Sequence, residues 1–355
     1  MKKILALILF LSVSIALIAC NKEQDVTGEE NNARSRTIST FYFNTFSAVY
    51  TYGDKDDAAI EKYKSIAEEE LKCYHELFDI YYEYAGVNNI KTINRNAGKS
   101  PIKVDGKLVE FLQYCKELYT LTNGKTNIML GSVLGIWHDA RDEASADFGY
   151  LSSEKLPTEQ ELSLAAEHTS IDLLVINEED STVYISDPKA SIDVGAIAKG
   201  YTVDKIVNRL KSEGANSVAL NIGGNIRTIG LKPGDKPWVT GITNPDKDAE
   251  NSIKCKVEMG DCSLVTSGDY ERYFYVGDKK YHHIIDPDTL MPAEYFASIS
   301  IVTKDSGFAD ALSTALFCMS YEEGIDFVKS LEGVDVIWIF KDGRLEHTEG
   351  ITFAN

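Results

Sequence analysis

The sequence has few basic residues, few cysteines and only one long apolar run. Lys and Arg total 36 against 55 Asp and Glu, which gives the 355-residue chain a formal net charge of -19. So acidic a surface repels phosphate backbones and anionic headgroups, which disfavours broad nucleic-acid binding and a polybasic membrane contact. Hydrophobic residues make up 44% and charged residues 26%, as in ordinary globular proteins, so disordered, collagenous and multi-span membrane classes are excluded.

Cysteine is scarce and irregularly spaced. Of the 6 cysteines, those beyond Cys20 are odd in number, lie far apart and include no C-x-x-C pair. This pattern favours neither a disulfide framework nor a thiolate metal site. Cys255 and Cys262 flank a predicted turn and could therefore form a disulfide. The alternative is that both are free thiols.

The single long apolar run, residues 4–19, follows two lysines and ends at Cys20. It is shorter than the ~20 residues that a bilayer-spanning helix needs, which predicts a secretory signal at residues 1–19. Its end, Leu-Ile-Ala-Cys, resembles the bacterial lipobox, which implies a lipid on Cys20 and a chain anchored to the cell membrane on its extracytoplasmic face. The alternative is an ordinary signal peptide with a chance cysteine.

Residues 20–37 are polar and charged, with almost no large apolar side chains. Such a segment buries too little surface to order itself, so a flexible tether is predicted, followed by a domain at 38–355.

Hydrophobic spacing in the domain mixes helices with strands. Helices are predicted at 56–82, 107–119, 157–167, 196–213, 309–319 and 321–330. Strands are predicted at 39–52, 172–177, 183–186, 191–194, 218–222, 238–242, 253–259, 263–266, 272–276, 298–303, 334–340 and 345–348. The order has no steady βαβ rhythm, no repeat and no long internal linker. We therefore expect the α+β (mixed α/β) class, as one large domain of two intimately packed lobes with mixed sheets and flanking helices.

The segment Asp193–Tyr201 combines a carboxylate at a predicted strand end, small residues and Lys199 in the first turn of a helix. Free N–H groups at a helix start beside a lysine favour a phosphate. The spacing is not that of a Walker A loop, and a plain strand-to-helix turn is the alternative.

Two further polar clusters follow strands. Gly223 and Gly224 would allow the backbone to approach a bulky ligand closely. The alternative is that they only form a tight turn. The cluster Thr266–Arg272 offers hydroxyls, a carboxylate and an arginine around Gly268, although any polar hairpin has such a composition.

His282 and His283 are adjacent at the end of a predicted strand. Neighbouring strand residues point to opposite faces, so a shared zinc ion is disfavoured. One imidazole facing a cleft suits acid–base chemistry, and a buried, hydrogen-bonded histidine is the alternative.

Asp310 and Thr314 lie four residues apart, on one face of a predicted helix. A carboxylate with a hydroxyl suits a hard cation such as Mg²⁺, whose remaining ligands are often phosphate oxygens. The alternative is that Asp310 only caps the helix.

Together and in this order, these segments resemble the ApbE family of FAD:protein FMN transferases, from about Phe41 to Val334. The motifs that carry the resemblance are Asp193–Gly200, Asn221–Gly224, Thr266–Arg272, His283–Pro287 and Asp310–Thr314. Residues 88–94 and 131–138 also look like a subgroup of this family.

The resemblance implies a membrane-anchored enzyme that binds FAD with Mg²⁺, transfers FMN to a Thr or Ser of an acceptor flavoprotein and releases AMP. Such acceptors belong to extracytoplasmic or membrane redox complexes. The implied metal ligands are Asp310, Thr314 and the carbonyl of Ala196. The implied catalytic residues are His283 and, as an assistant, Asp193. The implied FAD-binding residues are Asp193, Lys199, Ile284, Gly223, Gly224, Thr266, Ser267 and Gly268.

Other functions stay open at this point. They are a Mg²⁺-dependent FAD pyrophosphatase, a flavin-storage lipoprotein and, less consistent with the cation pair, a solute-binding lipoprotein. For an anionic substrate we expect a locally positive cleft, made by Mg²⁺, Lys199 and either Arg227 or Arg272. Leu290 stands where the family usually has a glycine, in a turn that the resemblance places beside the flavin.

Overall fold

The structure is a computed structural model that describes residues 34–52 and 57–355. The predicted signal sequence, the lipidation site Cys20 and the first part of the tether lie outside the described residues. Within the described ranges, no helix has both the length and the apolar character that a membrane crossing requires.

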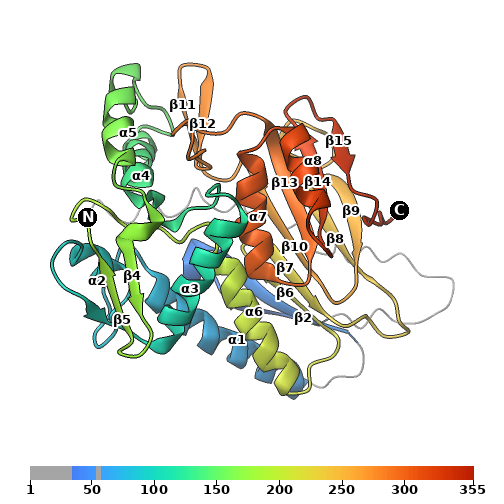
Figure 1. Cartoon of the computed structure of the whole chain (residues 1–355). Helices are drawn as coiled ribbons and strands as arrows, with labels where there is room; N and C mark the ends of the chain where they lie inside the picture. The colour runs from blue at the N-terminus through green and yellow to red at the C-terminus, as the bar shows by residue number, and fades with distance from the viewer. Residues whose placement is uncertain (1–33, 53–56) are drawn as a thin grey trace, which may run out of the picture.

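Across the described residues, eight strands form one antiparallel sheet in the order β1-β2-β6-β7-β10-β13-β14-β15 (Figure 1). The strands are β1 (Arg34–Ser39), β2 (Ser47–Thr51), β6 (Val218–Ile222), β7 (Asn225–Ile229), β10 (Ser263–Gly268), β13 (Phe296–Thr303), β14 (Asp335–Phe340) and β15 (Leu345–His347). Side chains alternate between its two faces. On β14, Val336 and Trp338 belong to one core cluster, whereas Ile337 and Ile339 belong to another. The sheet is therefore buried on both sides.

Helices cover one face and a β-hairpin covers the other (Figure 1). The helices are α1 (Asp57–Phe78), α6 (Ala198–Ser212), α7 (Ser306–Phe317) and α8 (Tyr321–Lys329), and the hairpin is β8 (Trp238–Thr243) with β9 (Ile253–Met259). The buried side chains of α1, among them Ile60, Tyr63, Ala67 and Leu71, recur every three or four residues. This spacing places them on a single helix face that packs on β2 and α6.

A second lobe lies beside the N-terminal ends of α6 and α7. Its elements are α2 (Ile90–Arg95), β3 (Ile102–Lys103), α3 (Gly106–Leu121), α4 (Gly131–Ser145), α5 (Glu159–Ala166), β4 (Leu174–Asn177), β5 (Thr182–Ile185), β11 (Tyr273–Val276) and β12 (Lys279–His282), with short 3-10 turns at Tyr42–Asn44, Ile128–Leu130, Ser153–Lys155 and Ile171–Leu173. Ala198 and Tyr201 of α6 share a core cluster with Leu108 and Phe111 of α3 in this lobe. The lobes are thus packed together, and the predicted α+β class is confirmed.

The domain begins earlier than predicted. Residues 34–37, assigned to the 20–37 tether, form most of β1, which pairs with β2. Arg36 of β1 forms ion pairs with Asp57 at 3.1 Å and Glu61 at 2.5 Å. The segment is polar and charged, which suggested a tether. The acidic partners that neutralise its arginines lie on α1, more than twenty residues further along the chain, and could not be identified from the segment alone.

Several element predictions also need correction. Residues 191–194 form no strand, and the sequence analysis assigned no element to α2, α4 or β7. The cysteines of the described residues are free thiols, including Cys255 in β9 and Cys262 just before β10. The candidate disulfide between them is therefore absent: Cys255 lies in the β8–β9 hairpin, and Cys262 leads into the eight-stranded sheet.

Candidate functional site

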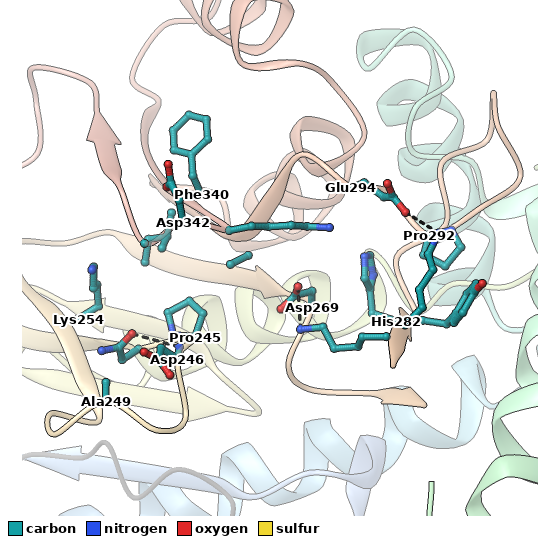
Figure 2. Close-up of a pocket in the computed structure, with 18 of the residues that line it drawn as sticks. Pro245, Asp246, Ala249, Lys254, Asp269, His282, Pro292, Glu294, Phe340 and Asp342 are labelled. Atoms are coloured by element: carbon teal, nitrogen blue, oxygen red, sulfur yellow. Dashed lines mark hydrogen bonds and ion pairs between the residues drawn. The ribbon is translucent and has the colours of Figure 1, made fainter. Parts of the chain in front are cut away.

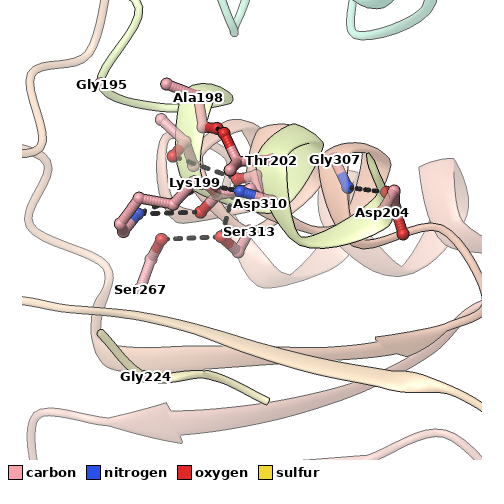
Figure 3. A network of polar contacts seen from close by, with 12 residues as sticks. Gly195, Ala198, Lys199, Thr202, Asp204, Gly224, Ser267, Gly307, Asp310 and Ser313 are labelled. Atoms are coloured by element: carbon pink, nitrogen blue, oxygen red, sulfur yellow. Dashed lines mark hydrogen bonds and ion pairs between the residues drawn. The ribbon is translucent and has the colours of Figure 1, made fainter. Parts of the chain in front are cut away.

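The site is built where α6 crosses α7. Gly200 has no side chain at the crossing, and a Cβ there would lie 2.1 Å from the Ser306 carbonyl oxygen. The helices therefore meet backbone to side chain, and the Gly200 N–H donates to Asp310 Oδ2 at 2.9 Å (Figure 3). Lys199 Nζ lies 3.4 Å from the same oxygen. The crossing places a carboxylate and an ammonium group together at the start of α6.

Asp310 is not the cap of its helix. Asp305 occupies the N-cap position of α7 and accepts the Phe308 N–H at 2.6 Å. Asp310 lies in the next turn, with its side chain only 6% exposed, and so interacts with α6 instead. The capping alternative from the sequence is therefore wrong.

The polar network continues from α7 to the sheet. Thr314 Oγ1 donates to the Asp310 carbonyl at 3.4 Å, and Ser313 Oγ donates to it at 2.9 Å. Ser313 also hydrogen-bonds Ser267 of β10, with the two hydroxyl oxygens 2.7 Å apart (Figure 3). Thr266, one residue earlier, instead pairs with Ser300 at 2.7 Å. Since neighbouring strand residues face opposite ways, the structure brings Ser267 to this network and leaves Thr266 outside it.

The donors near Asp310 suit Mg²⁺. They are the Asp310 carboxylate and the hydroxyl of Thr314, one helical turn further along α7. The turn that contains the Ala196 carbonyl comes directly before Lys199 and Gly200, which contact Asp310. These oxygens are all hard ligands of the kind Mg²⁺ prefers. Within the part of the chain that the structure describes, no group of three or more His, Cys, Asp or Glu could hold a metal ion. This single-carboxylate site would leave several Mg²⁺ positions to water or phosphate oxygens.

Asp193 lies in a loop held by the second lobe. Its N–H donates to the Ile128 carbonyl at 2.8 Å, and its Oδ1 accepts the Gly195 N–H at 2.9 Å. Its Oδ2 lies 3.7 Å from His138 Nε2, and the other ring nitrogen of His138 is 3.4 Å from the Tyr81 hydroxyl. These contacts to Ile128 and His138 hold the segment without strand pairing.

The two adjacent histidines have different environments. His282 is buried, donates from Nε2 to the Ala293 carbonyl at 2.7 Å and accepts the Ile284 N–H at Nδ1, 3.2 Å away. His283 is partly exposed, with Nδ1 3.2 Å from the Arg272 carbonyl. A carbonyl only accepts, so Nδ1 carries the proton and Nε2 keeps its lone pair. Burial and the nearby Arg272 hold the pKa of His283 well below its ordinary value, so its ring is neutral at neutral pH.

His283 shares a small cleft with a second histidine and two arginines. The cleft is lined by His138, Arg141, Arg272 and His283 over Trp137, Phe274 and Tyr281, and is closed by Leu134 and His282. Burial, followed by the influence of both arginines, lowers the pKa of His138 despite the attraction of Asp193. Arg227 lies elsewhere, buried in β7 and paired with Asp261 at 2.6 Å. Of the two arginines expected to make the cleft positive, the structure therefore places Arg272 there and not Arg227.

The remaining predicted residues surround this region. Gly223 and Gly224 form the β6–β7 turn with φ values of +57° and +87°, which L side chains rarely adopt. A Cβ on Gly224 would meet no atom within 4 Å, so its backbone faces open space. At Gly268 a Cβ would lie 2.6 Å from the Tyr270 ring. Ile284 is buried, and its carbonyl accepts the Ala293 N–H at 3.0 Å.

A larger pocket of about 790 Å³ lies on the other side of His282 (Figure 2). None of the predicted site residues lines it. Two of its lysines are neutralised, Lys280 by Asp269 at 2.8 Å and Lys279 by Glu294 at 3.0 Å. The chemistry of the α6–α7 crossing is therefore not repeated in this pocket.

A model of the ApbE family matches residues 43–338. The chain belongs to the ApbE family. It is 33% identical over 279 residues to a FAD:protein FMN transferase of Treponema pallidum, covering 74% of this chain and 73% of that protein. It is 26% identical over 333 residues to the Haemophilus influenzae FAD:protein FMN transferase, covering 92% and 90%.

Solved structures of ApbE proteins share this architecture. The ApbE protein of Thermotoga maritima superposes with a TM-score of 0.75 at 26% identity, covering 89% of this chain and 97% of that one. The flavin transferase ApbE of Vibrio cholerae superposes with a TM-score of 0.71 at 25% identity, again covering 89% and 97%. Family and fold therefore agree along the same length of chain.

The polar cleft residues His138 and Arg141, and Tyr81 next to His138, were not among the predicted site residues. His138 ends the segment 131–138, which had looked similar to the family, and is one of only 6 histidines. That rarity was the available signal for His138. Nothing in the local pattern marked Tyr81 or Arg141, because they meet Asp193 and Arg272 only in the folded chain.

Proposed function

We propose that this protein is a Mg²⁺-dependent FAD:protein FMN transferase, which attaches FMN through a phosphoester bond to a Thr or Ser of an acceptor flavoprotein and releases AMP. The observation that carries the proposal is the α6–α7 crossing, which brings Asp310, Lys199 and the start of a helix together. His283, whose Nδ1 is held by the Arg272 carbonyl, supplies a neutral imidazole from the neighbouring segment of the family motifs. The names of the Treponema and Haemophilus relatives support the same activity.

The α6–α7 crossing would bind the pyrophosphate of FAD. Lys199 and the first N–H groups of α6 attract phosphate oxygens. Asp310, Thr314 and the Ala196 carbonyl would hold Mg²⁺, which when bound neutralises phosphate charge. The backbone at Gly224, with Gly223, Ser267, Gly268 and Ile284 around it, would contact the rest of FAD, whereas Thr266 faces away.

The transfer step needs one proton acceptor. The acceptor hydroxyl oxygen forms a bond to the phosphorus of the FMN half, the anhydride bond to AMP breaks, and the hydroxyl proton moves to His283 Nε2. Such a base contributes roughly 10²–10⁴-fold to the rate. Asp193 lies next to His138 and would assist by orienting this side of the cleft.

A labelling assay tests the proposal. The chain without residues 1–20 is incubated with FAD, Mg²⁺ and a flavin-accepting domain, and covalent flavin fluorescence on the denatured acceptor is the expected result. Free FMN without labelling would show a pyrophosphatase instead, and intact bound FAD would show storage. Asp310→Ala should abolish Mg²⁺-dependent turnover, and His283→Ala should lose transfer but still bind FAD.

We further propose that a lipid on Cys20 anchors the enzyme to the extracytoplasmic face of the cell membrane, where its acceptors would be membrane or extracytoplasmic flavoproteins. The lipobox-like sequence before Cys20 supports this. Fatty-acid labelling of cells should mark the natural chain and not the Cys20→Ser variant. Equal labelling of both would remove Cys20 as the site.

A further inference from the structure

Two arginines from distant segments meet beside His283. Arg141 lies on α4, and Arg272 directly precedes β11, yet both line the cleft that contains His138 and His283. The aromatic wall fixes this meeting, since the Trp137 ring stacks on Tyr281 with centroids 6.0 Å apart. The Trp137 indole N–H also donates to the Leu290 carbonyl at 3.0 Å. Trp137 thereby ties α4 to the loop that follows the histidines.

The positive charge of this pair is poorly balanced. Across the residues that the structure describes, the Arg272 guanidinium makes no hydrogen bond or ion pair. Arg141 forms an ion pair of 3.8 Å with Asp142, which is 73% exposed. Burial and the neighbouring Arg141 both lower the pKa of Arg272. Asp193 and Glu271 are the carboxylates that act on Arg272, and Asp193 lies against His138. Two guanidinium groups that line one cleft, without an ion pair on Arg272 among the described residues, favour binding of an additional anion.

The position of the pair selects the anion. Under the proposed function, on which this inference rests, His283 Nε2 lies next to the acceptor hydroxyl and therefore next to the phosphorus under attack. Lys199 and the start of α6 serve the other end of the pyrophosphate. We propose that Arg141 and Arg272 form a clamp for the phosphate of the FMN half, the group that is transferred. A planar guanidinium donates two parallel hydrogen bonds to a phosphate, and its charge stabilises the oxygens during transfer.

Flavin binding tests the clamp without turnover. FMN and riboflavin differ only in the phosphate, so the natural chain should bind FMN roughly 10–100-fold more tightly, as measured by flavin fluorescence. Arg272→Ala and Arg141→Ala should each reduce this preference and leave riboflavin affinity unchanged. Arg272→Lys should recover part of the FMN preference, because a lysine keeps the positive charge but cannot donate two parallel hydrogen bonds to the phosphate. Arg95→Ala is the control, because Arg95 is exposed and pairs only with Glu83 on the surface.

Two results would overturn the clamp. One is equal affinity of the natural chain for FMN and riboflavin. The other is an unchanged FMN preference in both alanine variants together with a higher KM for the acceptor, which would assign the arginines to acceptor binding. The FMN preference is independent of transferase activity. Its loss in the variants would support the clamp even if the natural chain transferred no flavin, so the two proposals fail separately.

Discussion

At the scale of single residues, the side-by-side histidines show how neighbouring backbone groups assign different roles to one residue type. His282 uses both ring nitrogens within the protein, on the Ala293 carbonyl and the Ile284 N–H. Among the residues that the structure describes, the ring of His283 hydrogen-bonds only through Nδ1, to the Arg272 carbonyl. His283 thus keeps one nitrogen available for a proton. Of the two alternatives open from sequence, the buried, hydrogen-bonded histidine describes His282. His283 lines the cleft, and its role as a base stays a proposal.

This difference predicts the pH dependence of the reaction. Burial and Arg272 lower the pKa of His283, so the neutral form that accepts a proton persists below pH 6.5, the approximate ordinary value for histidine. We expect the acid limb of the kcat/KM profile for FMN transfer to lie clearly below pH 6.5. A limb at or above that pH would remove His283 as the base, and a His283→Ala chain with residual activity should show no such limb.

Leu290 shows how a departure from the family pattern is tolerated. It has a φ of +61°, in the left-handed region, although the residue is not glycine. The strain costs about 1–2 kcal/mol, and Leu290 offsets part of it by packing on the cluster around Trp137. The turn that a glycine would favour is therefore present without the glycine.

At the scale of elements, the crossing of α6 and α7 depends on the missing side chain of Gly200. A Cβ there would lie 2.1 Å from the Ser306 carbonyl and 2.8 Å from the Asp310 Cβ. Gly200→Ala should therefore separate the helices, lower the free energy of unfolding by about 1–3 kcal/mol and reduce transfer strongly. Urea unfolding and the labelling assay measure these effects. Gly106→Ala is the control, because a Cβ at Gly106 would meet no atom within 4 Å, and comparable losses in both variants would contradict this account.

The same pair of helices contains two neighbouring carboxyl groups. Asp204 of α6 accepts the Gly307 N–H at 2.8 Å and lies near Asp305, the cap of α7 (Figure 3). Burial, followed by repulsion from Asp305, raises the pKa of Asp204 to about 7. Between about pH 4 and pH 7 the folded chain keeps a proton that the unfolded chain has lost, so stability falls as the pH rises through this window.

Asp204→Asn should remove that dependence. The amide oxygen still accepts the Gly307 N–H, and its NH₂ group donates to Asp305 without adding charge. We expect the variant to be more stable than the natural chain by up to a few kcal/mol at pH 8, and equally stable near pH 4. Thermal unfolding at both pH values measures this, and a parallel pH dependence in the two chains would show that Asp204 is not responsible.

Patterns within one element could be predicted from the sequence, and contacts between elements could not. The apolar spacing of α1 identified one helix, and the segments Asp193–Gly200 and Asp310–Thr314 marked the starts of two others, but not that those two helices cross. The strand β1 was missed because its arginines are neutralised by α1, and Tyr81 and Arg141 were missed because tertiary packing alone brings them to Asp193 and Arg272. The choice between Arg227 and Arg272 likewise depended on Asp261, a partner in the turn between β9 and β10.

At the scale of the whole molecule, β1 makes the segment before the predicted boundary part of the domain. Ile38 is 5% exposed in the core beneath α1, and removing it would cost about 1.5–3 kcal/mol in buried surface. A chain that starts at residue 40 should therefore unfold at lower urea concentration than one that starts at residue 34. Equal midpoints would place the boundary at 38, as the composition had suggested.

The two outer strands of the sheet also bear on solubility. An exposed strand edge offers unpaired N–H and C=O groups to a second molecule, which is a route to aggregation. Here β1 carries Arg34 and Arg36, each in an ion pair with α1, while β15 at the far edge is only three residues long. The charges on β1 and the short length of β15 both disfavour pairing between the sheets of two molecules. We therefore expect little aggregation through the sheet edges at high protein concentration.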